Sequence, residues 1–157
     1  MIYKESKEDL LRQGLTKTCP VDWKAINNLM RRAYADLETA RRNLDDDPEC
    51  AYNYAYNGML RSGLALMLSE GLRPEIKDKH LTIVKFASSI LGNRFRKVIN
   101  DYDFMRRKRH RFIYEADIPC SATEAENAIK TAKRFVEMIG QLIKKKNPQI
   151  EFDLKLS

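Results

Sequence analysis

Residues 121–146 read SATEAENAIKTAKRFVEMIGQLIKKK. Apolar residues recur in this stretch every three or four positions, the spacing that places them on one face of an α-helix. They are Ala128, Ile129, Ala132, Phe135, Val136, Ile139, Leu142 and Ile143. The sequence at 121–124 is a capping box, and the three lysines at 144–146 complement the helix dipole. The stretch therefore predicts a long amphipathic helix that needs other helices to cover its apolar face.

Helical spacing also occupies most of the chain before this stretch. The helices expected there span residues 22–44, 49–70, 81–91 and 94–115. The breaks between them contain Pro48, Gly71 and Gly92, residue types that end helices. Because short connections between long helices favour antiparallel neighbours, the sequence predicts an all-α, up-and-down bundle of four main helices plus a shorter one.

Length and composition predict one domain over residues 1–157. The hydrophobic share is 43%, which in a chain of this length supports one core but not two. Residues 1–20 are expected to form an N-terminal arm with a short helix before Gly14. Residues 147–157 are expected to form a C-terminal tail, in which 150–156 alternate as in a strand. A lone strand has no pairing partner in a helical bundle, so we expect a loose tail or a contact with another chain.

The cysteines and histidines argue against several kinds of site. Cys19, Cys50 and Cys120 form no paired motif, which indicates reduced thiols in the cytosol and no structural zinc. His80 and His110 are the two histidines, and a multi-histidine metal centre would need both to converge. His80 is interpreted as a residue at the start of a helix. No phosphate-binding loop or nucleophile-elbow motif occurs, and we predict neither a metal nor a cofactor.

The sequence also gives no sign of a membrane protein. No apolar run approaches the roughly 20 residues that span a bilayer. The first residues lack the apolar core of a signal peptide. We therefore predict a cytoplasmic protein that has no membrane association.

The positive charge is concentrated in one segment. The net charge of the whole chain is +7, and residues 94–111 alone hold eight basic and two acidic side chains. Within this segment, residues 105–115 read MRRKRHRFIYE. A local excess of this kind indicates an anionic partner such as RNA, although basic helix faces are commonly just hydrated. The candidate phosphate-binding or RNA-binding residues are Arg106, Arg107, Lys108 and Arg111.

Arg109 differs from its basic neighbours because it falls on the apolar stripe of the expected helix. The other members of the stripe are Phe95, Val98, Tyr102, Met105 and Phe112. Burying a guanidinium is unfavourable unless an anion or an acceptor offsets its desolvation. Arg109 is therefore expected to face a cleft, another subunit, or an acidic side chain. The acids considered for such an ion pair are Asp36, Glu38 and Glu70.

His110 and Tyr114 lie one helical turn apart, next to Arg109. Arg109 can bind a phosphate through two hydrogen bonds, and Arg106 can hold the same anion. His110 titrates near neutral pH and can move a proton, whereas Tyr114 can orient a substrate or stack on a base. These groups can support metal-independent RNA cleavage, in which a base deprotonates the ribose 2′-hydroxyl and arginine stabilises the developing charge. The alternative interpretations are that His110 is an ordinary surface histidine and that Tyr114 is an aromatic residue packed in the protein.

Three segments of the chain resemble the HEPN superfamily, the higher eukaryotes and prokaryotes nucleotide-binding domain. Residues 51–68 look like its second-helix signature, 79–86 like the start of its third helix, and 105–115 like its catalytic helix. The resemblance implies an up-and-down helical bundle, often a homodimer whose motif helices meet in a cleft. Many members are metal-independent endoribonucleases, commonly toxins encoded with a nucleotidyltransferase antitoxin, and others keep only a binding role.

The family's active motif begins with an arginine and a polar residue and carries a histidine farther along the helix. Arg109 and His110 match the first two, and Tyr114 stands at the expected position of the histidine. A tyrosine, with a pKa of about 10, is a poor base at neutral pH. The resemblance thus implies catalytic positions at Arg109, His110 and Tyr114, with His110 acting as the base or only positioning the substrate.

The leading hypothesis is an RNA-binding HEPN homodimer with Arg109 in an intersubunit cleft and endoribonuclease activity of the toxin–antitoxin or defence type. The alternative is a catalytically inactive HEPN interaction module that binds a nucleotidyltransferase partner or a nucleotide. A third hypothesis is a structural dimer in which Arg109 forms an interface salt bridge. The sequence leaves all three open.

Overall fold

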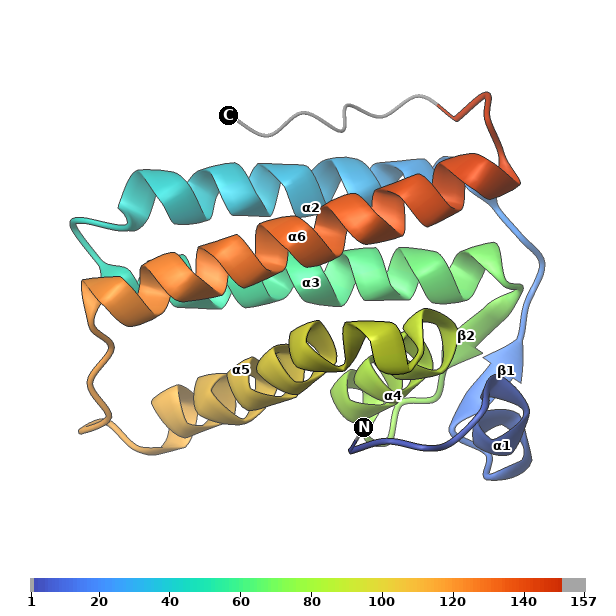
Figure 1. The fold of residues 1–157 in the computed structure, drawn as a ribbon, viewed down its shortest axis with the longest axis horizontal. Coiled ribbons are helices and arrows are strands. Elements are labelled where there is room, and N and C mark those ends of the chain that lie inside the picture. The colour runs from blue at the N-terminus through green and yellow to red at the C-terminus, as the bar shows by residue number, and fades with distance from the viewer. Residues whose placement is uncertain (1, 151–157) are drawn as a thin grey trace.

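The computed structural model describes residues 2–150 and shows an all-α bundle (Figure 1). Its helices, in chain order, are α1 (Lys7–Arg12), α2 (Trp23–Asn43), α3 (Pro48–Ser69), α4 (Lys79–Leu91), α5 (Arg96–Tyr114) and α6 (Ala122–Lys146). A short 3₁₀ helix, η1 (Asn93–Phe95), precedes α5. The predicted fold class is confirmed, and the expected long helices agree with the observed ones to within two residues at each end.

The helix starts follow from the residues at the breaks. The Asp22 carboxylate accepts hydrogen bonds from two backbone N–H groups in the first turn of α2. The Asp47 carboxylate accepts one from the N–H of Cys50 in α3, at 3.1 Å. The Ser121 hydroxyl accepts one from the N–H of Glu124 in α6, also at 3.1 Å. Each bond satisfies a donor that has no partner inside its helix, so these caps fix where the helices begin.

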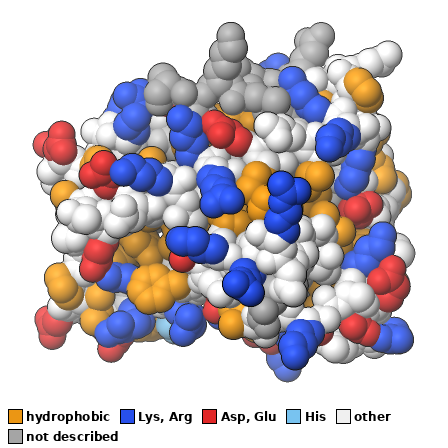
Figure 2. All heavy atoms as spheres, viewed as in Figure 1, with side chains coloured by type: hydrophobic (Ala, Val, Ile, Leu, Met, Phe, Trp, Pro, Cys, Tyr) orange, Lys and Arg blue, Asp and Glu red, His pale blue; other side chains and the backbone are white. Residues whose placement is uncertain are grey.

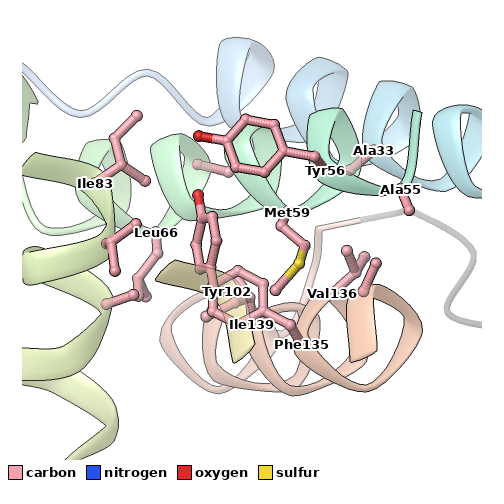
Figure 3. Close-up of a cluster of buried hydrophobic side chains, with 14 of the residues drawn as sticks. Ala33, Ala55, Tyr56, Met59, Leu66, Ile83, Tyr102, Phe135, Val136 and Ile139 are labelled. Carbon is pink, nitrogen blue, oxygen red and sulfur yellow. The ribbon is translucent and has the colours of Figure 1, made fainter. Parts of the chain in front are cut away.

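Helix α3 is the centre of the bundle. α2 and α3 lie side by side, α6 crosses them, and α4 and α5 pack below α3 (Figure 1). The buried residues of α3 occur on several sides of the helix, which suits a helix that has several neighbours. Tyr56, Met59 and Leu66 of α3 are fully buried, as are Phe135 and Ile139 of α6, which lie in the same cluster (Figure 3).

α3 and α4 approach each other closely at Gly63. A Cβ atom at this position would lie 2.5 Å from Cγ2 of Ile83, closer than packed atoms come. A residue without a side chain therefore lets α4 rest directly on α3. This contact holds the beginning of α4 beside the middle of α3, where the candidate site forms.

The structure contains a small sheet that the helical pattern does not predict. β1 (Thr16–Thr18) pairs antiparallel with β2 (Leu72–Pro74), and Thr16 lies opposite Pro74. The sequence indicates only a break near Gly71, because strands of three residues are too short to show an alternating pattern. The sheet joins the end of the N-terminal arm to the turn that follows α3.

Side-chain contacts fasten the N-terminal arm to α4 and α5. Tyr3 Oη donates a hydrogen bond to Asp103 Oδ1 at 2.8 Å. Lys85 Nζ lies 3.1 Å from Glu5 Oε1 and 5.6 Å from the centre of the Tyr3 ring. Asp103 is 4% exposed, and a carboxylate at that depth is unfavourable without partners. The arm therefore helps to satisfy a buried charge of α5.

Asp36 of α2 is a second buried carboxylate, placed at the contact with α3. It is 2% exposed, and Arg61 Nη1 lies 3.1 Å from its Oδ1 and 3.0 Å from its Oδ2. Burial raises the pKa of Asp36 to about 6, while the charges of Arg61 and Arg32 act in the opposite direction. The fold therefore favours the protonated form of this side chain more than water does.

The raised pKa of Asp36 predicts that stability falls with rising pH. A carboxyl whose pKa is raised on folding contributes stability that is fully present below pH 3.8 and is lost as the pH passes about 6. Between about pH 4 and pH 7, urea unfolding should show the wild type losing on the order of 2 kcal/mol relative to Asp36→Asn. A difference between the two proteins that stays constant over this range would contradict the prediction.

The remaining expectations concern the thiols, the membrane and the tail. Cys19, Cys50 and Cys120 are free thiols, as predicted. Within residues 2–150, no helix is both long and apolar enough to cross a bilayer. The predicted strand-like tail lies outside the described residues except for Ile150, which packs against the core and is 8% exposed.

Candidate functional site

Arg109 lies on the face of α5 that packs against α3, where the apolar stripe predicts it. The stripe residues Val98, Tyr102, Met105 and Phe112 are buried. The Arg109 side chain is half-buried, and its Nε atom is buried without a hydrogen-bond partner. The guanidinium carbon lies 5.4 Å from the centre of the Tyr56 ring on α3. A cation–π contact at this distance stabilises the guanidinium but gives the buried Nε–H group no acceptor.

The acids considered as internal partners of Arg109 are all paired elsewhere. Asp36 pairs with Arg61, Glu38 with Arg41, and Glu70 with Lys146. None of the ion pairs formed within residues 2–150 includes Arg109. The interpretation of Arg109 as an ion pair with one of these three acids is therefore wrong, and the cleft and the subunit interface stay open as interpretations.

Arg106 and Arg107 share one carboxylate on their own helix. Arg106 Nη2 lies 3.0 Å from Asp103 Oδ1, and Arg107 Nε lies 3.3 Å from Asp103 Oδ2. Asp103 also accepts the hydrogen bond from Tyr3. The side chain of Arg106 is 25% exposed and that of Arg107 is 62% exposed, so Arg107 is the more accessible to a ligand.

Lys108 and Arg111 also have carboxylate partners. Lys108 Nζ pairs with Glu124 at the start of α6, and Arg111 Nε lies 2.9 Å from Glu115 Oε2. Each of the four predicted phosphate-binding side chains thus has an acidic partner. Arg109 is the cation of this run that has none in the part of the chain that the structure describes. The structure therefore singles out Arg109 as the anion-binding candidate.

His110 and Tyr114 form a pair on the outside of α5. Their ring centres are 4.5 Å apart, as expected for residues one turn apart. His110 is exposed, and Tyr114 is 73% exposed. Within the described residues, no hydrogen bond or ring contact joins either of them to Arg109. The two predicted catalytic partners of Arg109 therefore lie together but on a different face of the helix.

The structure places His80 close to Arg109, which the sequence does not indicate. His80 is the second residue of α4, and its Nδ1 atom lies 3.0 Å from the hydroxyl oxygen of Tyr56. The two rings are 5.8 Å apart with an angle of 31°. Tyr56 thus contacts the imidazole through its hydroxyl group and the Arg109 guanidinium through its ring.

The surroundings of this cluster keep His80 and Tyr56 uncharged at neutral pH. Burial, followed by the charges of Arg109, Lys79 and Arg106, lowers the pKa of His80. Burial raises the pKa of Tyr56, although the charge of Arg109 opposes this. The cluster therefore combines one guanidinium, one neutral imidazole that can accept a proton, and one phenol that remains protonated.

A separate groove runs between α5 and α6. Its cavity volume is about 610 Å³, and its lining includes Tyr52, Phe104, Met105, Lys108 and Ala128. Figure 2 shows hydrophobic side chains in the hollow between these helices and charged ones on its rim. Tyr52 Oη is buried without a hydrogen-bond partner, and Phe104 is 56% exposed. Arg109 does not line this groove.

Comparison with protein families places the chain in a known one. A family model described as the HEPN domain matches residues 26–144, from the first turn of α2 to the last turn of α6. The matched region includes Tyr56, His80 and Arg109. No curated protein and no solved structure matches the chain.

Proposed function

The chain belongs to the HEPN domain family, and from this membership we propose that it binds RNA and cleaves it as a metal-independent endoribonuclease of the toxin–antitoxin or defence type. The observation that carries the proposal is the state of Arg109. Its guanidinium is half-buried, its Nε atom has lost water without gaining a partner, and none of the described carboxylates pairs with it.

An RNA phosphate supplies the negative charge that Arg109 lacks. A desolvated guanidinium is stabilised by an anion, and its terminal nitrogens match two phosphate oxygens. Arg106 and Arg107, whose charges are partly offset by Asp103, add a weaker attraction on the same helix. During cleavage the attacked phosphate gains negative charge, so a fixed guanidinium stabilises the transition state more than the bound substrate.

The exposed pair of His110 and Tyr114 supports a role in holding RNA bases. Unpaired bases stack on aromatic side chains, and both rings are open to solvent. We assign these two residues to substrate positioning within this proposal.

The first test of the proposal is incubation of labelled single-stranded RNA with the protein in excess EDTA. Attack by the ribose 2′-hydroxyl should give fragments that end in a 2′,3′-cyclic phosphate, with a 5′-hydroxyl on the other fragment. An RNA with a single 2′-deoxy sugar at the cleavage site is the matched control and should stay intact there. Cleavage that needs an added metal ion, or that also cuts the deoxy control, would contradict the proposed chemistry.

A second candidate function is docking of a protein partner, and one observation favours it. Phe104, Ile113 and Tyr114 of α5 are 56%, 59% and 73% exposed, so three large apolar side chains of one helix face solvent. Exposed apolar side chains mark interaction sites when they form a contiguous patch, and Ile113 and Tyr114 are neighbours at the end of α5. A co-encoded nucleotidyltransferase or a second copy of the chain would cover them. RNA binding without cleavage, together with a stable complex with the partner, favours this function.

A further inference from the structure

We propose that His80, and not His110, is the general base of the RNA cleavage, and that Tyr56 holds its imidazole ready beside Arg109. This inference rests on the proposed nuclease function and names the residue that would accept the proton. It assigns a catalytic task to a histidine from α4, whereas the arginine comes from α5. The two helices meet at this point through Tyr56 of α3.

The hydrogen bond between His80 and Tyr56 directs Nδ1 of the imidazole to the phenol, so Nε2 is the ring nitrogen left for the proton transfer. Nδ1 of His80 lies 3.0 Å from the Tyr56 hydroxyl oxygen. When Nδ1 carries the proton and donates it to this oxygen, Nε2 presents a free lone pair. Tyr56 is fully buried and packs on Tyr102, with ring centres 5.8 Å apart. Its hydroxyl group is therefore a fixed support for the imidazole ring.

Arg109 is close enough to His80 for their charges to interact. Burial lowers the pKa of the His80 imidazole, and the positive charges of Arg109, Lys79 and Arg106 lower it further. The fold thus favours the neutral form of His80. Its side chain is half-buried, as is that of Arg109.

His110 lacks these features. It is exposed, and its ring contact is with Tyr114 instead of with a buried residue. An exposed side chain changes its rotamer at little cost. Within residues 2–150, no hydrogen bond or ring contact joins His110 to Arg109. A general base must lie within hydrogen-bond reach of the proton that it removes, and fixed geometry is what His80 has.

The proposed step balances without any further reactant. His80 Nε2 takes the proton from the ribose 2′-hydroxyl while the 2′-oxygen forms a bond to the adjacent phosphorus. The bond from phosphorus to the 5′-oxygen breaks, and that oxygen leaves with its electron pair and takes a proton from water. The products are a 2′,3′-cyclic phosphate and a 5′-hydroxyl, and the imidazolium returns its proton to solvent. Arg109 stabilises the charge on the phosphate oxygens throughout.

The test compares two variants of His80 by single-turnover cleavage of the labelled RNA. His80→Asn keeps a donor where Nδ1 lies and removes Nε2, so the contact with Tyr56 can persist. It should lower the cleavage rate roughly 100-fold while RNA affinity stays close to that of the wild type. His80→Ala should lose the same activity and regain part of it when imidazole is added, which a purely structural role of His80 would not produce. Circular dichroism checks that both variants are folded.

The pH dependence of cleavage gives an independent readout. The wild-type rate should rise with pH and level off below neutrality, because the pKa of His80 is lowered. This acidic limb should disappear in His80→Asn. His110→Asn should raise the KM for RNA while the acidic limb remains. The matched control is Arg134→Ala, which removes an exposed charge from α6 and should cleave like the wild type.

The outcomes separate the two proposals. A wild type that does not cleave RNA removes the nuclease function, and with it the role of His80. A wild type that cleaves, with full activity in both His80 variants and loss of activity in His110→Asn, overturns the assignment of His80 alone. Loss in His80→Ala without rescue by imidazole, and with an unchanged acidic limb in His80→Asn, also overturns it.

Discussion

Replacing Arg109 by alanine is expected to lower kcat/KM for RNA cleavage by roughly 100- to 1,000-fold, the usual effect of removing a fixed donor to a developing oxyanion. The reason is that, among the residues of the basic run, Arg109 is the guanidinium that pairs with none of the carboxylates in residues 2–150. Arg106 lies one turn away, but its charge is engaged by Asp103. The measurement is initial-rate kinetics on a fluorescent RNA in excess EDTA.

Two further variants show how the loss of activity in Arg109→Ala should be interpreted. Arg109→Lys keeps the charge but not the planar pair of donors, so it should recover only part of the activity. Arg134→Ala removes a charge from the exposed surface of α6 and should stay within about twofold of the wild type. Equal activity of wild type and Arg109→Ala would remove the main support for the proposed function. A loss that accompanies unfolding would show a structural role instead.

Replacing Phe135 by alanine is expected to cost about 3–5 kcal/mol of unfolding free energy, because truncation of a buried ring loses its contacts and leaves a cavity. Phe135 is fully buried in α6, and its ring lies 5.0 Å from that of Tyr102 in an edge-to-face arrangement. Figure 3 shows it in the cluster with Met59 and Ile139. Chemical denaturation of the variant, monitored by circular dichroism, gives the difference directly.

The matched control for this change is Phe104→Ala on α5. Phe104 is 56% exposed and lines the groove between α5 and α6, so it has few buried contacts to lose. Its truncation should cost less than about 1 kcal/mol. Comparable losses for Phe104 and Phe135 would mean that the cluster around Tyr102 is not the centre of the core.

The long helices could be predicted from the sequence because their information is local. The spacing of apolar residues and the caps at Asp22 and Ser121 are contained within single segments, and each helix forms where its own residues indicate. The pairing of β1 with β2 is not local. Thr16 and Pro74 are far apart in the chain, and neither strand carries a pattern that points to the other.

The candidate site also has one part that local sequence patterns predict and one part that depends on tertiary packing. The position of Arg109 on an apolar stripe predicts its burial, and spacing of three and four residues connects Asp103 to Arg106 and Arg107. The spacing of Asp103 from Arg106 and Arg107 is visible in the sequence, and it indicates that less of their positive charge is free to bind RNA. His80 could not be found this way, because its contact with Tyr56 depends on the packing of α4 against α3.

The attachment of the N-terminal arm also sets an order of events during synthesis. Tyr3 precedes its partner Asp103 by 100 residues. A ribosome adding about 5–20 residues per second delivers that partner roughly 5–20 s after the arm has emerged. Leu10 is fully buried in the folded protein, and α4, which packs against α1, is made about 70 residues later. The part of the chain that is translated first is therefore among the last to reach its native contacts.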